Sequence, residues 1–262
     1  MTKFSNQIAS EQEASAEVAD ATPSSVIELR RYRLHHGARE RLIDLFDREF
    51  IESQETLGMS VIGQFRDLDD PNSFVWLRGF QDMPSRAVAL NSFYTGPVWA
   101  SHRDEANGTM VNSDNVLLLR PASPGAGLPP PRVARPALGA TDLPPSLVVA
   151  TICYLAPRTE DEFAKFFEVT LKPHLEQAAA TVLATLVTER DPNTFPRLPV
   201  REGETVFVWL CAFPDLNAYQ VHLADLAQSE IWMTDTVPEM ERRTWRQNEV
   251  SRLRPTARSL LR

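Results

Sequence analysis

Apolar and polar residues alternate along residues 26–34, as they do in a β-strand whose two faces differ. Two similar segments follow, and the turn-forming residues 68–72 separate them. Other stretches carry apolar residues at helical spacing, for example Leu42, Ile43 and Phe46. The pattern predicts a β-α-β-β-α-β order, with strands at 26–34, 59–67, 73–80 and 115–120 and helices at 38–53 and 85–93.

This unit occurs twice in the chain. Residues 74–80 return as residues 207–213 with five of the seven positions identical, and upstream of them Tyr32 is matched with Tyr154. A colinear series of such matches indicates a duplication. The spacing between matched residues grows along the chain, which places an insertion in the second copy near residues 193–205. We therefore predict an α+β fold built from two ferredoxin-like repeats.

A proline-rich segment separates the two copies. Residues 121–146 contain eight prolines, which is typical of a semi-extended linker. The first 25 residues are polar and rich in Ala, Ser and Glu, a composition that favours a disordered leader. The predicted organisation is a leader at 1–25, a first repeat at 26–120, a linker at 121–146 and a second repeat at 147–262.

Composition narrows the range of partners. The net charge of −8 argues against nucleic acid or an anionic membrane surface as a main partner. No apolar run approaches the ~20 residues that span a bilayer, and the N-terminal residues lack the pattern of a secretory signal. Cys153 and Cys211 are placed on opposite faces of the second sheet, so we expect no disulfide between them. These features predict a cytoplasmic protein with reduced thiols.

Strand alternation also separates the two faces of each predicted sheet. Helices can cover only one face, so the other must meet water or a second sheet. We expect the more apolar face of the first copy to lie under its helices: Ile27, Leu29, Val61, Phe65, Val75 and Leu77. The opposite face then carries Glu28, Arg30, Tyr32, Gln64, Arg66, Trp76 and Arg78. The matching positions of the second copy are Ala150, Ile152, Tyr154, Thr185, Val187, Trp209 and Cys211.

These last two faces are predicted to pack together, because an apolar sheet face gains about 25 cal/mol per Å² by leaving water. They would enclose a lumen that is polar on one wall and apolar on the other, as small-molecule sites are. The polar wall holds three arginines and one glutamate, an excess that favours an anionic ligand. In the alternative interpretation, these arginines lie at strand ends and reach water.

The candidate roles follow from this lumen. Arg30, Arg66 and Arg78 would hold negative charge on an anionic or enolisable molecule, and Tyr32 or Glu28 would handle a proton. Remaining contacts with the substrate would come from Gln64, Trp76, Tyr154 and Trp209. The five histidines show no metal-ligand spacing, and no glycine-rich phosphate loop or nucleophile elbow occurs. No cofactor and no metal are therefore expected.

Several motifs resemble the NIPSNAP family. They are Ile27–Tyr32 followed by Gly37, Phe93–Trp99, His102-Arg103, and Ser113–Arg120. The resemblance implies a dimeric α/β barrel closed by two ferredoxin-like units. Related barrels include cofactor-free oxygenases, isomerases, haem enzymes and non-catalytic binding proteins. We therefore predict a small-molecule protein that is a cofactor-independent monooxygenase or isomerase if it is catalytic. The alternatives are a non-catalytic scaffold and, third, a haem-binding barrel. A homodimer is compatible with the sequence.

Overall fold

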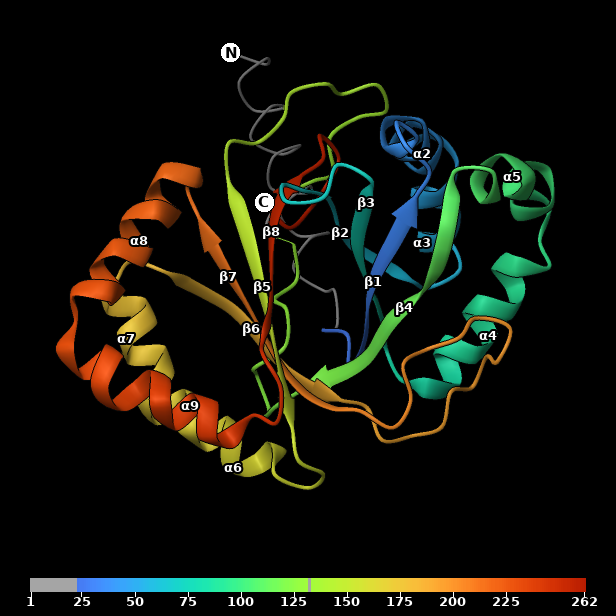
Figure 1. Ribbon diagram of the computed structural model, residues 1–262. Helices are drawn as coiled ribbons and strands as arrows, with labels where there is room; N and C mark the ends of the chain where they lie inside the picture. The colour runs from blue at the N-terminus through green and yellow to red at the C-terminus, as the bar shows by residue number, and fades with distance from the viewer. Residues whose placement is uncertain (1–22, 132) are drawn as a thin grey trace, which may run out of the picture.

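The computed structural model describes residues 23–131 and 133–262, and two helix-covered halves flank a shared set of strands (Figure 1). The predicted leader falls largely outside the described residues. The first half contains β1 (Val26–Leu34), α2 (Arg39–Leu45), η2 (Phe46–Phe50), α3 (Ile51–Glu55), β2 (Ser60–Asp67), β3 (Ser73–Phe80), α4 (Met83–Tyr94), α5 (Pro97–Asn107) and β4 (Met110–Pro121).

The second half repeats this order. It contains β5 (Leu147–Leu155), α6 (Glu160–Phe166), η3 (Phe167–Leu171), α7 (Lys172–Gln177), β6 (Thr181–Thr188), β7 (Thr205–Phe213), α8 (Leu216–Gln228), η4 (Trp232–Thr236), α9 (Val237–Arg243) and β8 (Glu249–Pro255). In each half the first long helix contains a π-helical segment, η2 or η3, at the same place. The described residues between β4 and β5 form neither helix nor strand.

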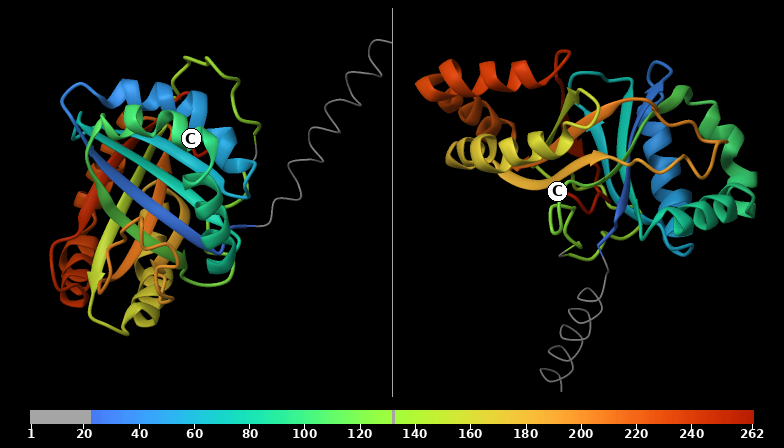
Figure 2. Two further views of the ribbon diagram at one scale, coloured as in Figure 1. Left: turned by 90° about the vertical axis from the view of Figure 1, so that its right-hand side faces the viewer. Right: turned by 90° about the horizontal axis from the view of Figure 1, so that it is seen from below.

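The eight strands close into one antiparallel barrel with the order β1-β3-β2-β8-β5-β7-β6-β4. Pairing of β2 with β8 and of β4 with β6 joins the two halves. The helices lie outside the barrel, those of one half on each side (Figures 1 and 2). The predicted α/β barrel within one chain is thereby confirmed, and no second copy is needed to close it.

The barrel interior is apolar on all sides. All eight strands contribute to one buried cluster that includes Ile27, Leu29, Phe65, Val75, Leu77, Ala150, Ile152 and Leu253. The predicted orientation of the first sheet was therefore wrong, because most of the set placed under the helices fills the barrel instead. Only Val61 packs on the helix side as predicted. The interior of an eight-stranded barrel is just wide enough for side chains and excludes water, so the most apolar face of each sheet turns inward.

The predicted correspondence between the first strands of the two copies, β1 and β5, was also wrong by one residue. Arg30 lies opposite Trp76 in the first half, and Thr151 lies opposite Trp209 in the second. Thr151 is therefore the counterpart of Arg30, and Cys153 rather than Tyr154 is the counterpart of Tyr32. A slip of one residue moves every side chain of a strand to the other face. This is why Ala150, Ile152 and Tyr154 point into the barrel, whereas Thr185, Val187, Trp209 and Cys211 lie on the helix side.

Cys153 and Cys211 accordingly share a face, contrary to prediction, and both belong to the core under the second half's helices. Both are nevertheless free, as predicted. Cys211 lies opposite Val149, four residues before Cys153 on the same strand, which separates the two sulfur atoms. The absence of a disulfide was thus predicted for the wrong reason.

The C-terminal segment and the linker contact the first half's long helix and the strand that follows it. Arg258 donates to the Asp47 carbonyl and pairs with Glu52, while Arg135 donates to the carbonyls of Val61 and Arg258. The half-buried Asp47 carboxylate nevertheless keeps one buried oxygen without a partner among residues 23–131 and 133–262. Burial raises the pKa of Asp47 to about 6 despite these two arginines.

This shift predicts a pH-dependent effect of Asp47→Asn. The folded-state pKa lies above the unfolded value of ~3.9, so stability is gained below the unfolded pKa and lost as the pH rises through 6. After discounting for partial exposure, the variant should raise the melting temperature by about 2–4 °C at pH 8 and by much less at pH 4. Thermal unfolding at both pH values checks this, with Asp142→Asn, an exposed position in the linker, as control. Equal shifts at the two pH values would contradict it.

Candidate functional site

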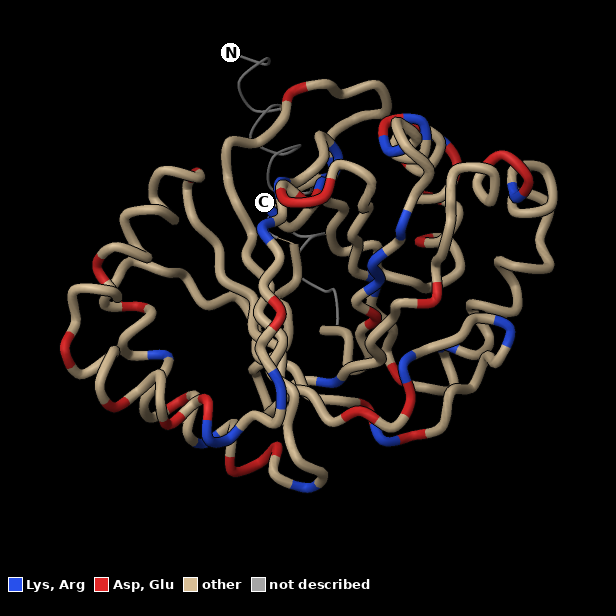
Figure 3. The backbone as a smooth tube through the Cα atoms, viewed as in Figure 1, with Lys and Arg blue, Asp and Glu red and all other residues tan. Residues whose placement is uncertain are grey.

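A charged cluster lies between the sheet and the helices of the first half. Glu28 and Arg30 come from β1, Arg78 from β3 and Arg86 from α4, and none is more than 1% exposed. In Figure 3 charged residues follow β1, whereas β6 and β7 are free of them. We call these four residues the buried charge cluster.

The Glu28 carboxylate is the centre of this cluster. Its Oε2 accepts from Arg30 Nη1 at 2.6 Å and from Arg78 Nε at 2.7 Å, and its Oε1 accepts from Arg86 Nε at 2.7 Å. Arg78 Nη1 also donates to Gln54 Oε1 at 3.1 Å. One carboxylate therefore faces three guanidinium groups, which leaves two formal positive charges buried in the protein.

The ionisation of the cluster reflects this imbalance. Burial alone would raise the pKa of Glu28, but the positive charges of Arg78, Arg30 and Arg86 outweigh it and hold the pKa well below its usual range. Burial lowers the pKa of Arg86 in spite of its contact with Glu28. Glu28 is consequently a fixed counter-ion, and a carboxylate this acidic is a weak base.

Several donors of this region have no partner among the described residues. They are Arg78 Nη2, Arg86 Nη2 and the indole Nε1 of Trp76. The guanidinium carbons of Arg30 and Arg78 lie 5.6 Å and 5.1 Å from the Trp76 ring centre, so the indole lies among the same cations. A buried unpaired donor costs about 1–3 kcal/mol, so three of them mark a place suited to an acceptor.

Tyr32 adjoins the cluster as a neutral hydroxyl. Its oxygen accepts from Arg30 Nε at 2.9 Å, and its ring meets Trp76 edge-on. Burial, with a smaller contribution from Tyr94, raises the pKa of Tyr32 even though Arg30 opposes the shift. The hydroxyl therefore keeps its proton near neutral pH and is suited to donate a hydrogen bond.

The second half supplies an internal comparison. The residues at the positions of Glu28, Arg30, Arg78 and Arg86 are Val149, Thr151, Cys211 and Tyr219, and the counterpart of Gln54 is Leu175. All are uncharged, and all but Thr151 belong to the apolar core of that half. The fold therefore forms without charge at these positions, as expected if buried ion clusters are not required for stability.

A long loop from the second half covers the cluster. Residues 189–204 connect β6 to β7 and extend across to α4 (Figures 1 and 2). Arg86 Nη1 donates to Asn193 Oδ1 at 3.0 Å and to Thr194 Oγ1 at 3.1 Å. The buried Phe195 stacks on Tyr94 with ring centres 5.7 Å apart. The predicted insertion at 193–205 is thus the covering segment, hereafter the cover loop.

Only some of the predicted site residues meet here. Glu28, Arg30, Tyr32, Trp76 and Arg78 do so. Gln64 shares their face, and both of its side-chain polar atoms are buried and have no partner in the part of the chain that the structure describes. Three others do not: Arg66 pairs with Glu40, Tyr154 binds Arg201 and Glu249 at one end of the barrel, and Trp209 packs in the core of the second half.

Arg86, Gln54 and Asn193 were not among the predicted site residues. Arg86 lies in the predicted second helix on the same stripe as Leu90 and Phe93, where a charged residue among apolar ones was a usable signal. The contact of Asn193 comes from the other half of the chain, and no local pattern indicates it.

Other kinds of site find no support in the part of the chain that the structure describes. Residues 23–131 and 133–262 contain no cluster of three or more His, Cys, Asp or Glu side chains able to hold a metal ion. Among these same residues, no helix has the length and apolar character needed to cross a bilayer.

Comparison with known proteins also distinguishes the first half of the chain from the second. Residues 27–124 match the family model NIPSNAP. The chain contains a NIPSNAP domain. This domain spans the first half, with the buried charge cluster inside it. A NIPSNAP-like domain protein from Burkholderia xenovorans is 28% identical, with 40% of this chain and 91% of that chain covered and a TM-score of 0.37. None of the curated proteins matches the sequence.

Solved structures also resemble the whole chain. An anthrone oxidase-like protein covers 91% of this chain and 93% of its own at a TM-score of 0.56, with 11% identity. A provisionally assigned monooxygenase from Fusobacterium nucleatum covers 90% and 94% at a TM-score of 0.53, with 10% identity. At such low identity these likenesses establish a shared fold and nothing about chemistry.

Proposed function

We propose that the NIPSNAP domain binds a small anionic or enolisable molecule between its sheet and its helices, beside the buried charge cluster. The observation that carries this proposal is the pair of uncompensated positive charges on fully buried side chains. A negatively charged ligand would neutralise them and accept from the unpartnered donors of Arg78, Arg86 and Trp76. The uncharged counterparts in the second half indicate that folding alone does not require this arrangement.

The same geometry favours stabilisation of an enolate over removal of a proton by the protein. Glu28 is too acidic to be an effective base, while Tyr32 and the guanidinium groups can donate hydrogen bonds to a developing oxyanion. The proton that the substrate loses on forming the enolate would pass to water. The electron-rich enolate then reduces dioxygen, which supplies the oxygen of the new C–O bond, without a cofactor. Cofactor-independent oxygenation is therefore the activity this site would support best, and the likeness to an anthrone oxidase-like protein is consistent with it.

Anthrone, an enolisable aromatic ketone, is a suitable probe. We expect saturable quenching of tryptophan fluorescence on its addition, and oxygen consumption under air that Arg86→Met abolishes. Quenching without oxygen uptake would support binding and reject oxygenation. Absence of both would contradict the proposal for this class of molecule. The exposed Arg103→Ala is the matched control for removal of an arginine.

Entry to the site requires displacement of the cover loop. Phe195→Ala removes the stacking on Tyr94 and should accelerate association and dissociation of anthrone by roughly 2- to 10-fold, the range expected for one aromatic pair. Stopped-flow fluorescence measures both rates, and Pro196→Ala, an exposed neighbour, is the control. Unchanged rates in Phe195→Ala would mean that the ligand enters elsewhere.

A non-catalytic interaction protein is the second candidate. The apolar barrel interior favours it, because side chains from all eight strands pack where a ligand was predicted. We further propose that each half is a ferredoxin-like unit within the predicted boundaries. The strand orders β4-β1-β3-β2 and β8-β5-β7-β6 support this assignment.

A further inference from the structure

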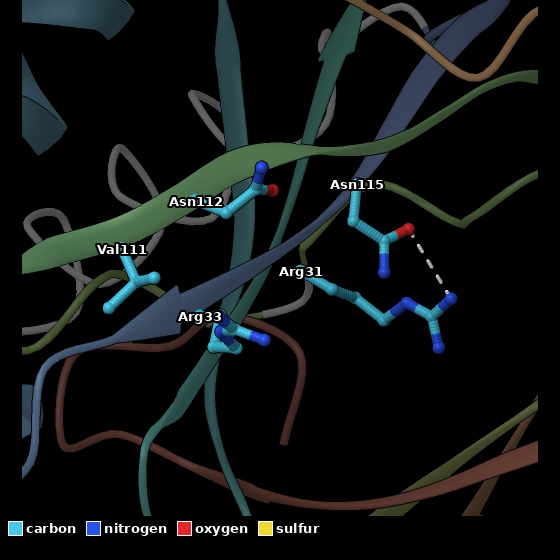
Figure 4. Close-up of a pocket in the computed structure, with 5 residues that line it drawn as sticks. All are labelled: Arg31, Arg33, Val111, Asn112 and Asn115. Carbon is cyan, nitrogen blue, oxygen red and sulfur yellow. Dashed lines mark hydrogen bonds between the residues drawn. The ribbon is translucent and has the colours of Figure 1, made fainter.

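A second cationic site lies at one end of the barrel, away from the buried charge cluster. A cavity of about 370 Å³ opens there, lined by Arg31, Arg33, Val111, Asn112 and Asn115 (Figure 4). Its volume falls within the range of about 300–1,000 Å³ that is usual for small-molecule sites. Its residues come from the end of β1 and the beginning of β4.

A β-bulge shapes this cavity. Arg31 lies opposite Asn115 and Arg33 lies opposite Asn112. Between these two pairs β1 advances by two residues and β4 by three, so β4 contains one extra residue. Bulges bend a strand and redirect its side chains, and they are frequent beside functional sites. Arg31 and Arg33 share one face of β1, so both guanidinium groups line the same space.

The two arginines differ in what they already bind. Arg31 pairs with Glu249 at 2.6 Å and donates to Asn115 Oδ1 at 3.4 Å. Arg33 is exposed, and its side chain forms no ion pair or hydrogen bond with the described residues. The Asn112 Oδ1 accepts from the Asp114 backbone N–H, which leaves its amide N–H groups available to donate.

Among the side chains that line this cavity and those connected to them, positive charge exceeds negative charge. Ion pairs and shared hydrogen bonds connect three guanidinium groups and two carboxylates, from Arg31, Arg201, Arg246, Glu204 and Glu249, and Arg33 adds a fourth guanidinium group that stands apart from this network. Two formal positive charges remain, in a protein whose net charge is −8. The carboxylate of Asp114 does not line the cavity.

We propose that this cavity binds a small organic anion through a carboxylate or phosphate group, held by Arg33 together with Arg31 and the amide of Asn112. Guanidinium groups bind such oxyanions through two parallel hydrogen bonds. Val111 gives the ligand a small apolar contact. The site is separate from the buried charge cluster, because Arg31 and Arg33 alternate with Arg30 and Tyr32 along β1 and face the other way.

Isothermal titration calorimetry with inorganic phosphate and with succinate at low ionic strength tests this proposal. We expect saturable binding of at least one probe, weakened about tenfold or more in Arg33→Ala and unchanged in Arg103→Ala. Binding of phosphate alone identifies a phosphate-bearing ligand, and binding of succinate alone a carboxylate. Because Arg33 is exposed, its replacement should leave the fold intact.

Three results would overturn the inference. They are the absence of saturable binding of either probe, equal affinity in Arg33→Ala, and loss of binding in Arg86→Met with retention in Arg33→Ala. The last result would place the anion at the buried charge cluster and would support the proposed function instead. Failure of this site and failure of the proposed function are therefore distinguishable.

Discussion

Replacing Glu28 by glutamine is expected to lower the free energy of unfolding by about 3–5 kcal/mol, the usual cost of removing one partner from a buried ion pair. The substitution keeps the shape of the side chain but leaves three guanidinium groups within 3 Å of a neutral amide. Arg30, Arg78 and Arg86 are all buried, so water cannot compensate for the lost charge.

Urea unfolding at pH 7 measures this effect, with the exposed Glu105→Gln as control. The effect should also depend on pH. The folded-state pKa of Glu28 is depressed, so its stabilisation is present above the unfolded pKa of ~4.3 and is lost as the pH falls below it. The difference between variant and wild type should therefore shrink at low pH. A loss below about 1 kcal/mol at pH 7 would contradict the description of Glu28 as the essential counter-ion.

Glu28→Gln removes one member of the cluster and should destabilise the protein. Replacing the whole cluster by the second half's residues should instead leave the free energy of unfolding unchanged or raise it. The variant carries Glu28→Val, Arg30→Thr, Gln54→Leu, Arg78→Cys and Arg86→Tyr. Each new side chain already occupies the equivalent position under the second half's helices. Replacing a whole buried ion cluster by apolar residues is often neutral or stabilising by about 1–4 kcal/mol. We therefore expect a folded protein at least as stable as wild type, without affinity for anthrone.

Circular dichroism and urea unfolding check the fold of this grafted variant, and fluorescence quenching checks binding. A control variant changes Thr151, on the other half, to Ser and should retain both properties. Retained affinity in a folded grafted variant would remove the cluster from the site. A grafted variant that unfolds would show that the charges serve stability, which contradicts the comparison between the two halves.

Much of the fold could be predicted from local pattern. The predicted bounds of β1 and β3 agree with the structure to the residue. The internal duplication predicted the repeated element order and the insertion in the second copy. Helix α5 was missed, because residues 97–107 are mostly polar and only Ala106 is buried. Strand β4 is longer than predicted because its first residues, including the polar Asn112 and Ser113, continue the pairing with β1 around a bulge.

The site could be predicted only in part. Alternation grouped Glu28, Arg30, Trp76 and Arg78 on one face correctly, since it depends on strand geometry alone. Which face turns toward the helices is decided by the closure of the barrel, a contact between distant strands. The covering of Arg86 by Asn193 and Thr194 likewise joins residues from different halves. Such contacts leave no periodic signal in the sequence.

Native mass spectrometry of wild-type protein and grafted variant, each incubated with anthrone and compared with its denatured mass, shows whether the buried charge cluster holds the ligand. We expect one bound anthrone per wild-type chain and none on the folded grafted variant. An unliganded wild-type mass, or equal occupancy of the two proteins, would contradict the assignment of the buried charge cluster as a small-molecule site.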